Sequence, residues 1–396
     1  MKQYLQHIKG DKAIWAIAAL LALLSFLPVY SSSSNLAYLY GNGNTLGYLL
    51  KHGMHLVLGF VILYAVHRIP YNYFRAFSII GMPIVFALLV YTLSQGTTID
   101  GANASRWIQI PLVGFTFQTS SLAMVVLMVY VATYLTKIKD KTISFKESIL
   151  PLWAPVFLVV GLILPANFST AAILFSMVVL LVFMGGYPFR YLAAILGVGV
   201  VMLSLFVLTA KAFPGVFPNR VDTWISRVES FTDSKDAEEG YQIEKAKIAI
   251  ATGGVAGLGP GKSVQKNFLP QSSSDFIFAI IIEEFGLIGA ILLMFLYVWL
   301  LFRILIVAGK ASSRFSKLVV IAVGIPIIFQ AFINMAVAVE LFPVTGQTLP
   351  LISSGGTSIW MTCLSLGIIL SVSAKRVEVK KETDEENPLD ILSEAV

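Results

Sequence analysis

Long apolar runs, separated by short polar or charged stretches, recur along the whole chain. A helix of about 20 apolar residues is long enough to cross the hydrocarbon core of a bilayer. The runs therefore predict ten membrane-spanning helices, at residues 13–30, 48–66, 76–95, 115–136, 149–164, 169–185, 191–210, 275–302, 318–341 and 356–374. The longest stretch between two such runs is 211–274, which we expect to lie outside the membrane as one long loop.

The composition favours a membrane protein with no large soluble domain. Of the 396 residues, 57% are hydrophobic and 13% are charged, whereas soluble domains carry about 25% charged residues. The first run, Ala13 to Tyr30, is long and lacks a small-residue cleavage site, which favours a retained helix over a cleaved signal peptide. We therefore expect an all-α integral membrane protein, with a polytopic domain at 1–374 and a polar, acidic tail at 375–396.

The positions of the basic residues predict the orientation. With the N-terminus inside, 18 of the 28 Lys and Arg residues lie in inner segments, and the short outer loops hold Lys51 and Arg106. The other cations lie in 211–274, and loops of that length are largely exempt from the positive-inside rule. Both termini are therefore predicted to be cytoplasmic, and the net charge of +6 follows from membrane topology without a nucleic-acid partner.

The segment AGLGPGKS at 256–263 ends like a phosphate-binding loop, in which glycine-rich backbone cradles phosphates and a Lys reaches the outermost ones. It lies, however, in the predicted outer loop and is followed by polar VQKNFLPQSSS, not by the helix that such a loop opens. The sequence therefore disfavours a nucleotide site. A tight glycine turn against the membrane surface is favoured, and contact with a phosphate there stays open.

Five polar segments rich in Gly or Pro are predicted on the same outer side, at 100–111, 165–170, 241–254, 268–286 and 342–356. Irregular backbone at membrane depth is tolerated only where protein or a water-filled cavity surrounds it. The segments therefore indicate a site at the outer leaflet. Its substrate is expected to be amphipathic, with a headgroup outside and a tail in lipid.

Asp275 stands between a polar segment and an apolar run, and it allows two interpretations. Ser272 and Asp275 have the spacing of a capping box at the start of a helix, so Asp275 could satisfy free backbone N–H groups. A carboxylate at a partly desolvated boundary can also act as a general base. The two roles are compatible with each other.

Four further charged residues are candidates near this boundary. Glu283 and Glu284 fall inside a span, where ionisable residues are costly and often functional, although pairing with a buried Lys or Arg would also explain one of them. They lie about 80° and 180° from Asp275 around a regular helix, so they cannot both share its face. Arg106 and Lys51 could each clamp a phosphate or anchor a helix end at the interface.

These segments together resemble the SEDS family (shape, elongation, division and sporulation) of FtsW/RodA-type peptidoglycan polymerases, along nearly the whole chain. The resemblance is carried by YQIEKAKIAIATGGVAGLGPGKSVQKNFLPQSSSDFIFAIIIEEFG at 241–286, by FPVTGQTLPLISSGGTS at 342–358 and by ASRWIQIPLVGFTFQTSS at 104–121. Order and spacing of the glycines, the Leu-Pro pair, Asp275 and the two Glu residues are similar to the family pattern.

The sequence also departs from that pattern. Gln-Pro-Ser-Glu followed by Ala-Lys is replaced by Gln118 to Ser121 followed by Ala123 and Met124, which removes an acid and a base. Pro-Asp-x-Gly-Thr reads Ala166 to Thr170, with Asn167 in place of the carboxylate, and Gln-Ser reads Lys245-Ala246. Asp275, the catalytic carboxylate by resemblance, is retained.

The resemblance implies polymerisation of lipid II, an undecaprenyl-pyrophosphate-linked saccharide, at the outer face of the bacterial cytoplasmic membrane. Asp275 would be the base, and Lys51, Arg106 and Lys262 would stabilise the charge of the leaving pyrophosphate, with Lys262 not required by the family pattern. The remaining candidate substrate-binding residues are Glu283, Gly346, Pro350 and Ser353. The expected partners are a class B penicillin-binding transpeptidase and other division or elongation proteins. No cofactor is implied, and a divalent cation stays open.

Two other functions fit ten helices. A transporter or flippase of lipid-linked precursors should carry polar residues along a path across the bilayer, whereas the charged candidates here gather in the outer half. A scaffold that recruits partners through 211–274 and the tail would tolerate loss of Asp275. Within the polymerases, the overall pattern and short tail favour a division-type over an elongation-type member.

Overall fold

The computed structural model of the chain describes residues 9–40, 45–95, 98–99, 102–103, 107–109, 116–138, 144–212, 237–269 and 271–385. The helices of this part are α2 (Lys12–Tyr40), α3 (Thr45–His67), α4 (Tyr73–Gln95), α5 (Thr119–Lys137), α6 (Phe145–Ser148), η1 (Ile149–Trp153), α7 (Ala154–Ile163), α8 (Phe168–Met184), α9 (Phe189–Ala212), α11 (Ala237–Gly253), η2 (Gln265–Asn267), α12 (Ile277–Gly309), α13 (Arg314–Ala338) and α14 (Gly356–Glu385). Two short antiparallel pairs complete it, β1 (Thr98–Ile99) with β2 (Ala102–Asn103) and β3 (Trp107–Gln109) with β4 (Thr116–Gln118).

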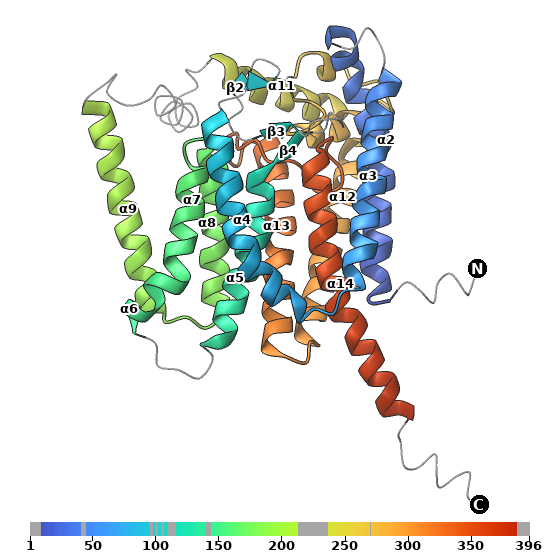
Figure 1. Cartoon of the computed structure of the whole chain (residues 1–396). Coiled ribbons are helices and arrows are strands. Elements are labelled where there is room, and N and C mark those ends of the chain that lie inside the picture. Colours follow the sequence, from blue (N-terminus) through green and yellow to red (C-terminus); the bar gives the residue numbers. More distant parts are fainter. Residues whose placement is uncertain are drawn as a thin grey trace, which may run out of the picture.

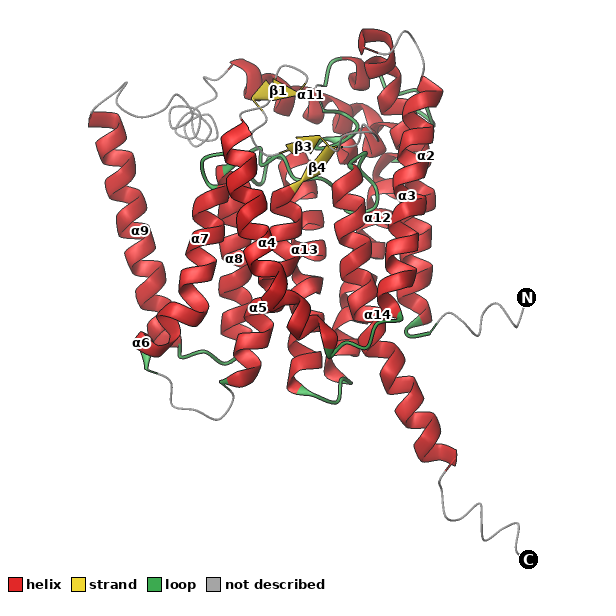
Figure 2. Ribbon diagram, in the orientation of Figure 1, coloured by secondary structure: helices red, strands yellow, loops and turns green. Residues whose placement is uncertain are grey.

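The long helices run side by side between two ends of the molecule (Figure 1). The strands, α11 and many of the connecting loops gather at the upper end, which is the predicted outer side (Figure 2). The start of α2 and the end of α14 both lie at the lower end (Figure 1). Both described ends of the chain are therefore on one side, as the distribution of basic residues predicts.

Eight helices within the described residues are long and apolar enough to cross a membrane. Two of the predicted spans, 169–185 and 191–210, correspond to shorter apolar stretches at Phe168–Met184 and Phe189–Met202. The prediction of an all-α, multi-pass membrane protein is confirmed. The count of ten spans stays a prediction.

Three elements differ from the sequence-based expectation. The expected span at 149–164 begins earlier, with α6 and a turn of π-helix ahead of α7. The expected outer loop 211–274 contains a 17-residue helix, α11, whose mixed polar and apolar sequence gives no long hydrophobic run. Helix α14 continues to Glu385, so the first residues of the expected tail extend the last span as a helix.

Helices α13 and α14 form the centre of the bundle, with 72% and 83% of their most apolar segments buried. Helix α3 packs against α14 through small residues, where a Cβ at Gly59 would lie 2.9 Å from the Cys363 sulfur. At Gly367, a Cβ would lie 2.8 Å from the Cβ of Val66. Glycines at such contacts allow the two backbones to approach closely, which is a common source of helix association in membranes.

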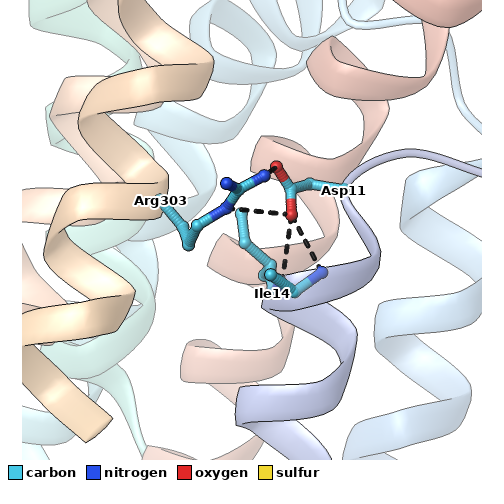
Figure 3. A network of polar contacts seen from close by, with 4 residues as sticks. Asp11, Ile14 and Arg303 are labelled. Carbon is cyan, nitrogen blue, oxygen red and sulfur yellow. Dashed lines mark hydrogen bonds and ion pairs between the residues drawn. The ribbon is translucent and has the colours of Figure 1, made fainter. Parts of the chain in front are cut away.

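An ion pair joins the lower ends of α2 and α12 (Figure 3). One oxygen of Asp11 accepts hydrogen bonds from the backbone N–H groups of Ala13 (2.9 Å) and Ile14 (3.3 Å), so Asp11 caps the N-terminus of α2. The Arg303 guanidinium donates to both carboxylate oxygens, through Nε to Oδ1 at 3.2 Å and through Nη2 to Oδ2. This pair fixes the inner end of α12, whose outer end carries the candidate site.

Candidate active site at the outer end of the bundle

The glycine-rich segment 254–261 docks against a kink in α12. The kink is at Gly286, whose φ of 67° and ψ of −168° are accessible essentially to glycine alone. Around it, the N–H groups of Leu258 and Gly259 donate to the carbonyls of Glu283 and Glu284, each at 2.9 Å. In return, Leu287 N–H donates to the carbonyl of Gly254 at 3.0 Å. These backbone N–H groups are therefore engaged by α12 and do not form a phosphate cradle.

The docking depends on two glycines. Gly257 has a φ of 79°, and a Cβ there would lie 2.6 Å from the backbone nitrogen of Gly286 and closer still to the carbonyl oxygen of Glu284. At Gly286, a Cβ would lie 2.5 Å from the backbone nitrogen of Gly257. Contacts this short with backbone atoms cannot be relieved by a side-chain rotation, so glycine is required at both positions.

The Glu283 carboxylate lies beneath the same segment and is completely buried. It accepts hydrogen bonds from the N–H groups of Val264 (3.0 Å) and Gln265 (3.3 Å) and from the hydroxyl of Ser263. These N–H and O–H donors satisfy the acceptor positions of a carboxylate that is removed from water. Glu283 thus ties the turn at 263–265 to α12; its predicted role as a substrate ligand stays a prediction.

Glu284 is also buried and links the segment to α2. Its Oε1 accepts from the Ser31 hydroxyl and from Ser263 N–H at 3.3 Å. Lys266 brings a cation into the same cluster, since its Nζ donates to Ser31 Oγ at 3.0 Å and to the carbonyl of Gly261 at 2.8 Å. Ser263 contacts both carboxylates, Glu284 through its backbone N–H and Glu283 through its hydroxyl.

Asp275 lies in the turn just before α12 and is only partly buried. The predicted capping box is wrong in its register, because α12 begins at Ile277 with Phe276 as its N-cap residue and no side-chain cap there. A series of turns from Gln271 delays the start of the helix, and Asp275 N–H donates to the carbonyl of Gln271 at 3.1 Å. Asp275 therefore does not occupy the third helical position that a capping box requires.

A buried amide holds the backbone of Asp275 against the opposite loop. Asn334 of α13 donates from Nδ2 to the carbonyl of Asp275 at 2.8 Å and to that of Gln347 at 2.7 Å. The Gln347 side chain in turn donates to Thr170 Oγ1 at 3.1 Å. Asn334 was not predicted as a site residue, although a polar residue within an apolar run is a signal that could have identified it.

The loop 346–355 completes the surroundings of Asp275. Gly346 has a φ of 65°, and a Cβ there would lie 3.5 Å from Asp275 Oδ2, so the carboxylate and this loop are in contact. Ser353 donates to the carbonyl of Ser274 at 2.6 Å, and the carbonyl of Pro350 accepts from Tyr297 at 2.5 Å. Three residues predicted for the site, Gly346, Pro350 and Ser353, thus belong to one loop beside Asp275.

A cleft of about 550 Å³, open solvent in its mouth included, lies next to this loop. Residues of β4, α5, α8, α13, α14 and the loop line it, and Gly346 lies both in its wall and beside Asp275. Its described lining consists of hydroxyl, amide and apolar side chains, among them Gln118, Thr170 and Gln347. A carboxylate at the edge of a neutral polar cleft can accept a proton from a hydroxyl bound there.

Of the three predicted cationic residues, the two that the structure describes, Lys51 and Lys262, do not line the cleft. Lys51 is exposed on α3, and Lys262 is exposed in the docked glycine segment. Arg106 lies outside the described residues. Their predicted role at a phosphate group therefore remains to be tested.

The departures from the family pattern have identifiable places. Ser121 and Met124, which replace the acid and the base, both line the cleft. Asn167, which replaces the second carboxylate, is the N-cap of α8 and accepts from Thr170 N–H at 3.1 Å. Lys245 lies on α11 with its ammonium 5.1 Å from the centre of the Tyr241 ring, a cation–π contact.

The fold and the site together define a class: a multi-pass membrane protein with a carboxylate beside a cleft at the predicted outer ends of its helices, and the described lining of this cleft is uncharged. The chain belongs to the FtsW/RodA/SpoVE family of cell cycle proteins, whose sequence pattern matches residues 11–378. The family resemblance stated from the sequence motifs is therefore confirmed.

Relatives and solved structures agree with this assignment. The chain is 31% identical to a probable peptidoglycan glycosyltransferase FtsW of Thioalkalivibrio sulfidiphilus, over 91% of this chain and 89% of the relative. It is 30% identical to a protein of a Geobacter species that carries the same description, over 94% of this chain and 99% of the relative.

Among solved structures, a chain from a study of the coordination of polymerisation and crosslinking by a peptidoglycan synthase complex matches with a TM-score of 0.71 and 26% identity, over 93% of this chain and 98% of that one. The Thermus thermophilus rod shape determining protein RodA shares the fold, with a TM-score of 0.66 at 23% identity over 93% and 97% of the two chains.

Proposed function

We propose that the protein is a peptidoglycan glycosyltransferase that polymerises lipid II at the outer face of the bacterial cytoplasmic membrane. The proposal rests on the position of Asp275. Its carboxylate lies beside Gly346 at the edge of a cleft whose described lining is uncharged, and Asn334 holds the backbone of Asp275. Membership of the family supports the same reaction. So do the relatives that align over most of their length and are described as probable peptidoglycan glycosyltransferases.

In the proposed reaction, Asp275 acts as the general base. Its carboxylate takes the proton of the 4-hydroxyl of an acceptor N-acetylglucosamine, and that oxygen attacks the anomeric carbon of a donor N-acetylmuramic acid. The new glycosidic bond forms as the bond from this carbon to the pyrophosphate breaks, with inversion. Undecaprenyl pyrophosphate leaves with the bonding electron pair, and Asp275 later returns its proton to water.

The geometry around Asp275 suits this role. Asn334 and Ser353 bind the carbonyls of Asp275 and Ser274, which belong to the two peptides that flank the Asp275 Cα, so these bonds position the carboxylate without engaging it. Gly346 leaves the space beside Oδ2 free of a side chain. Positioned groups of this kind contribute more to rate than mobile ones do.

The leaving pyrophosphate needs compensating positive charge. We assign this role to Lys51, Arg106 and Lys262, of which Lys51 and Lys262 are exposed and able to reach a headgroup at the membrane surface. Pro350 and Ser353 keep the loop beside Asp275 in place, and Glu283 supports the segment that carries Lys262.

A transpeptidase of the class B penicillin-binding type is the proposed partner. The similarity to a chain of a peptidoglycan synthase complex in which polymerisation and crosslinking are coordinated supports it. The relatives of 30% identity and more are described as FtsW, which favours a role in division. Depletion in the native host should then give long undivided cells, whereas round cells would indicate the elongation role.

The central test is polymer formation by the purified protein. The protein, with its transpeptidase partner bound, is given lipid II, and glycan chains are separated by electrophoresis for wild type, Asp275→Asn and the control Glu244→Gln. Glu244 is an exposed carboxylate on α11, so the control removes an outer negative charge away from the cleft. We expect Asp275→Asn to lower the rate by about two to four orders of magnitude.

Three results would contradict the proposal in different ways. Equal rates for wild type and Asp275→Asn would remove Asp275 as the base. No polymer from any variant, with the partner confirmed bound, would instead favour a flippase or a scaffold. A loss in Glu244→Gln as large as that in Asp275→Asn would point to an effect of surface charge.

A further inference from the structure

The cleft beside Asp275 contains no charged side chain among the described residues that line it. Hydroxyls and amides make up its polar part, and Met124, Val125 and Ile327 are among its apolar members. Hydroxyl and amide groups both donate and accept hydrogen bonds, so they match neutral sugar hydroxyl and acetamido groups. A pyrophosphate, by contrast, is bound most strongly by Arg, Lys or a metal ion.

Two side chains of α5, Ser121 and Met124, contribute neutral groups to the lining of this cleft. Ser121 and Met124 are three residues apart, which places them on one face of the helix, and both line the cleft. Ser121 donates to Gln118 Oε1 at 3.2 Å. Gln330 of α13 places its Nε2 3.5 Å from the sulfur of Met124. Both residues thus make neutral contacts with other residues of the lining.

These are also the two positions at which this chain lacks the acid and the base of the family pattern. Their joint replacement removes both charges, and the described residues that line the cleft include no other charged side chain. An unpaired charge in such a cleft would be costly, because desolvation of a single ion is not repaid. The cleft is therefore matched to an uncharged ligand group.

We propose that this cleft binds an uncharged part of the lipid-linked saccharide that bears hydroxyl and amide groups; this inference rests on the proposed function. The neutral pair Ser121 and Met124 is specificity-determining, because it excludes the pyrophosphate from the cleft. The pyrophosphate then binds outside the cleft, toward the exposed cations of the outer surface. A site can gain specificity in this way by withholding a favourable contact as well as by making one.

The first test adds a cation to the cleft. Met124→Lys is compared with the uncharged control Met124→Leu for binding of undecaprenyl pyrophosphate, which has no sugar, and for polymerisation of lipid II. We expect the affinity for undecaprenyl pyrophosphate to differ by less than about threefold between the two variants, and kcat/KM to be at least about tenfold lower for Lys. Tighter binding of undecaprenyl pyrophosphate by about tenfold or more in Met124→Lys would place the pyrophosphate in the cleft and overturn the proposal.

The second test separates charge from size. The kcat/KM of Ser121→Glu should be at least about tenfold lower than that of the equally large Ser121→Gln. The double variant Ser121→Glu/Met124→Lys should recover most of that difference, because the two charges then pair. Equal losses for Glu and Gln would overturn the charge argument. If wild type forms no polymer, the proposed function fails, while binding of undecaprenyl pyrophosphate to the position-124 variants still tests the cleft.

Discussion

Two kinds of carboxylate lie within a short stretch at the outer end of α12, and their surroundings differ. Glu283 is fully buried and accepts several N–H and O–H groups of the segment 254–266. Asp275 is partly exposed and lies beside Gly346, which lines the cleft. A buried carboxylate that accepts several backbone N–H groups stabilises a loop, whereas a partly exposed carboxylate beside a cleft can take a proton from a hydroxyl bound there. The comparison teaches that burial of a charge in a membrane helix is by itself a poor guide to catalysis.

The largest effect on stability is expected where the loop meets the kink of α12. Gly257→Ala forces a Cβ against the backbone at Glu284 and Gly286, whereas Gly261→Ala has a nearly identical φ of 78° and no atom within 4 Å. In both variants the left-handed backbone at the new alanine costs about 1–2 kcal/mol of stability. The clash should raise the total loss of unfolding free energy in Gly257→Ala to at least about 3 kcal/mol. Thermal unfolding in detergent measures both, and equal losses would show that the loop does not dock as described.

An intermediate effect is expected on the Asp275 side of the comparison. Asn334→Ala leaves the carbonyls of Asp275 and Gln347 without their shared donor, which should cost about 1–3 kcal/mol of stability. Because the backbone of the base is then less well fixed, kcat should fall by about tenfold with KM little changed. Steady-state polymerisation at a temperature where the variant is folded gives both constants. A rise in KM at constant kcat would assign Asn334 to substrate binding instead.

The smallest effect is expected at the inner end. Asp11→Asn keeps an acceptor for the N–H groups of Ala13 and Ile14, so the cap of α2 survives, but the ion pair with Arg303 is lost. The Asp11 side chain is 7% exposed and that of Arg303 is 30% exposed, and the amide oxygen can still accept from the guanidinium, so the loss of the charge should cost about 1–2 kcal/mol without changing the polymerisation rate. A change in rate at unchanged stability would mean that the inner end of α12 is coupled to the site.

Much of the fold could be predicted from the sequence, because helices that span a bilayer consist of long apolar runs. The 275–302 and 318–341 runs correspond to α12 and α13 within a few residues at most ends. Helix α11 and the strands β1 to β4 were not predicted, because they are short or of mixed polarity and are specified by their contacts at the surface.

The candidate site was predictable in part. Motif order brought Asp275 together with Gly346, Pro350 and Ser353, and the structure places these residues in contact or in one loop. The predicted angles of Glu283 and Glu284 from Asp275 assumed one regular helix, whereas Asp275 precedes α12 and Ser263 of the docked segment bonds both glutamates. That contact depends on backbone N–H groups and on the kink at Gly286, which no side-chain pattern records.

The most direct measurement compares Asp275→Asn with Glu283→Gln in one preparation, for both polymerisation of lipid II and thermal unfolding. Asp275→Asn should abolish most of the polymer, by about two to four orders of magnitude in rate, with a melting temperature near that of wild type. Glu283→Gln should lower stability by about 1–3 kcal/mol and leave polymer formation largely intact where it is folded. The reverse pattern, an active Asp275→Asn beside a stable but inactive Glu283→Gln, would contradict the account and move the catalytic role to Glu283.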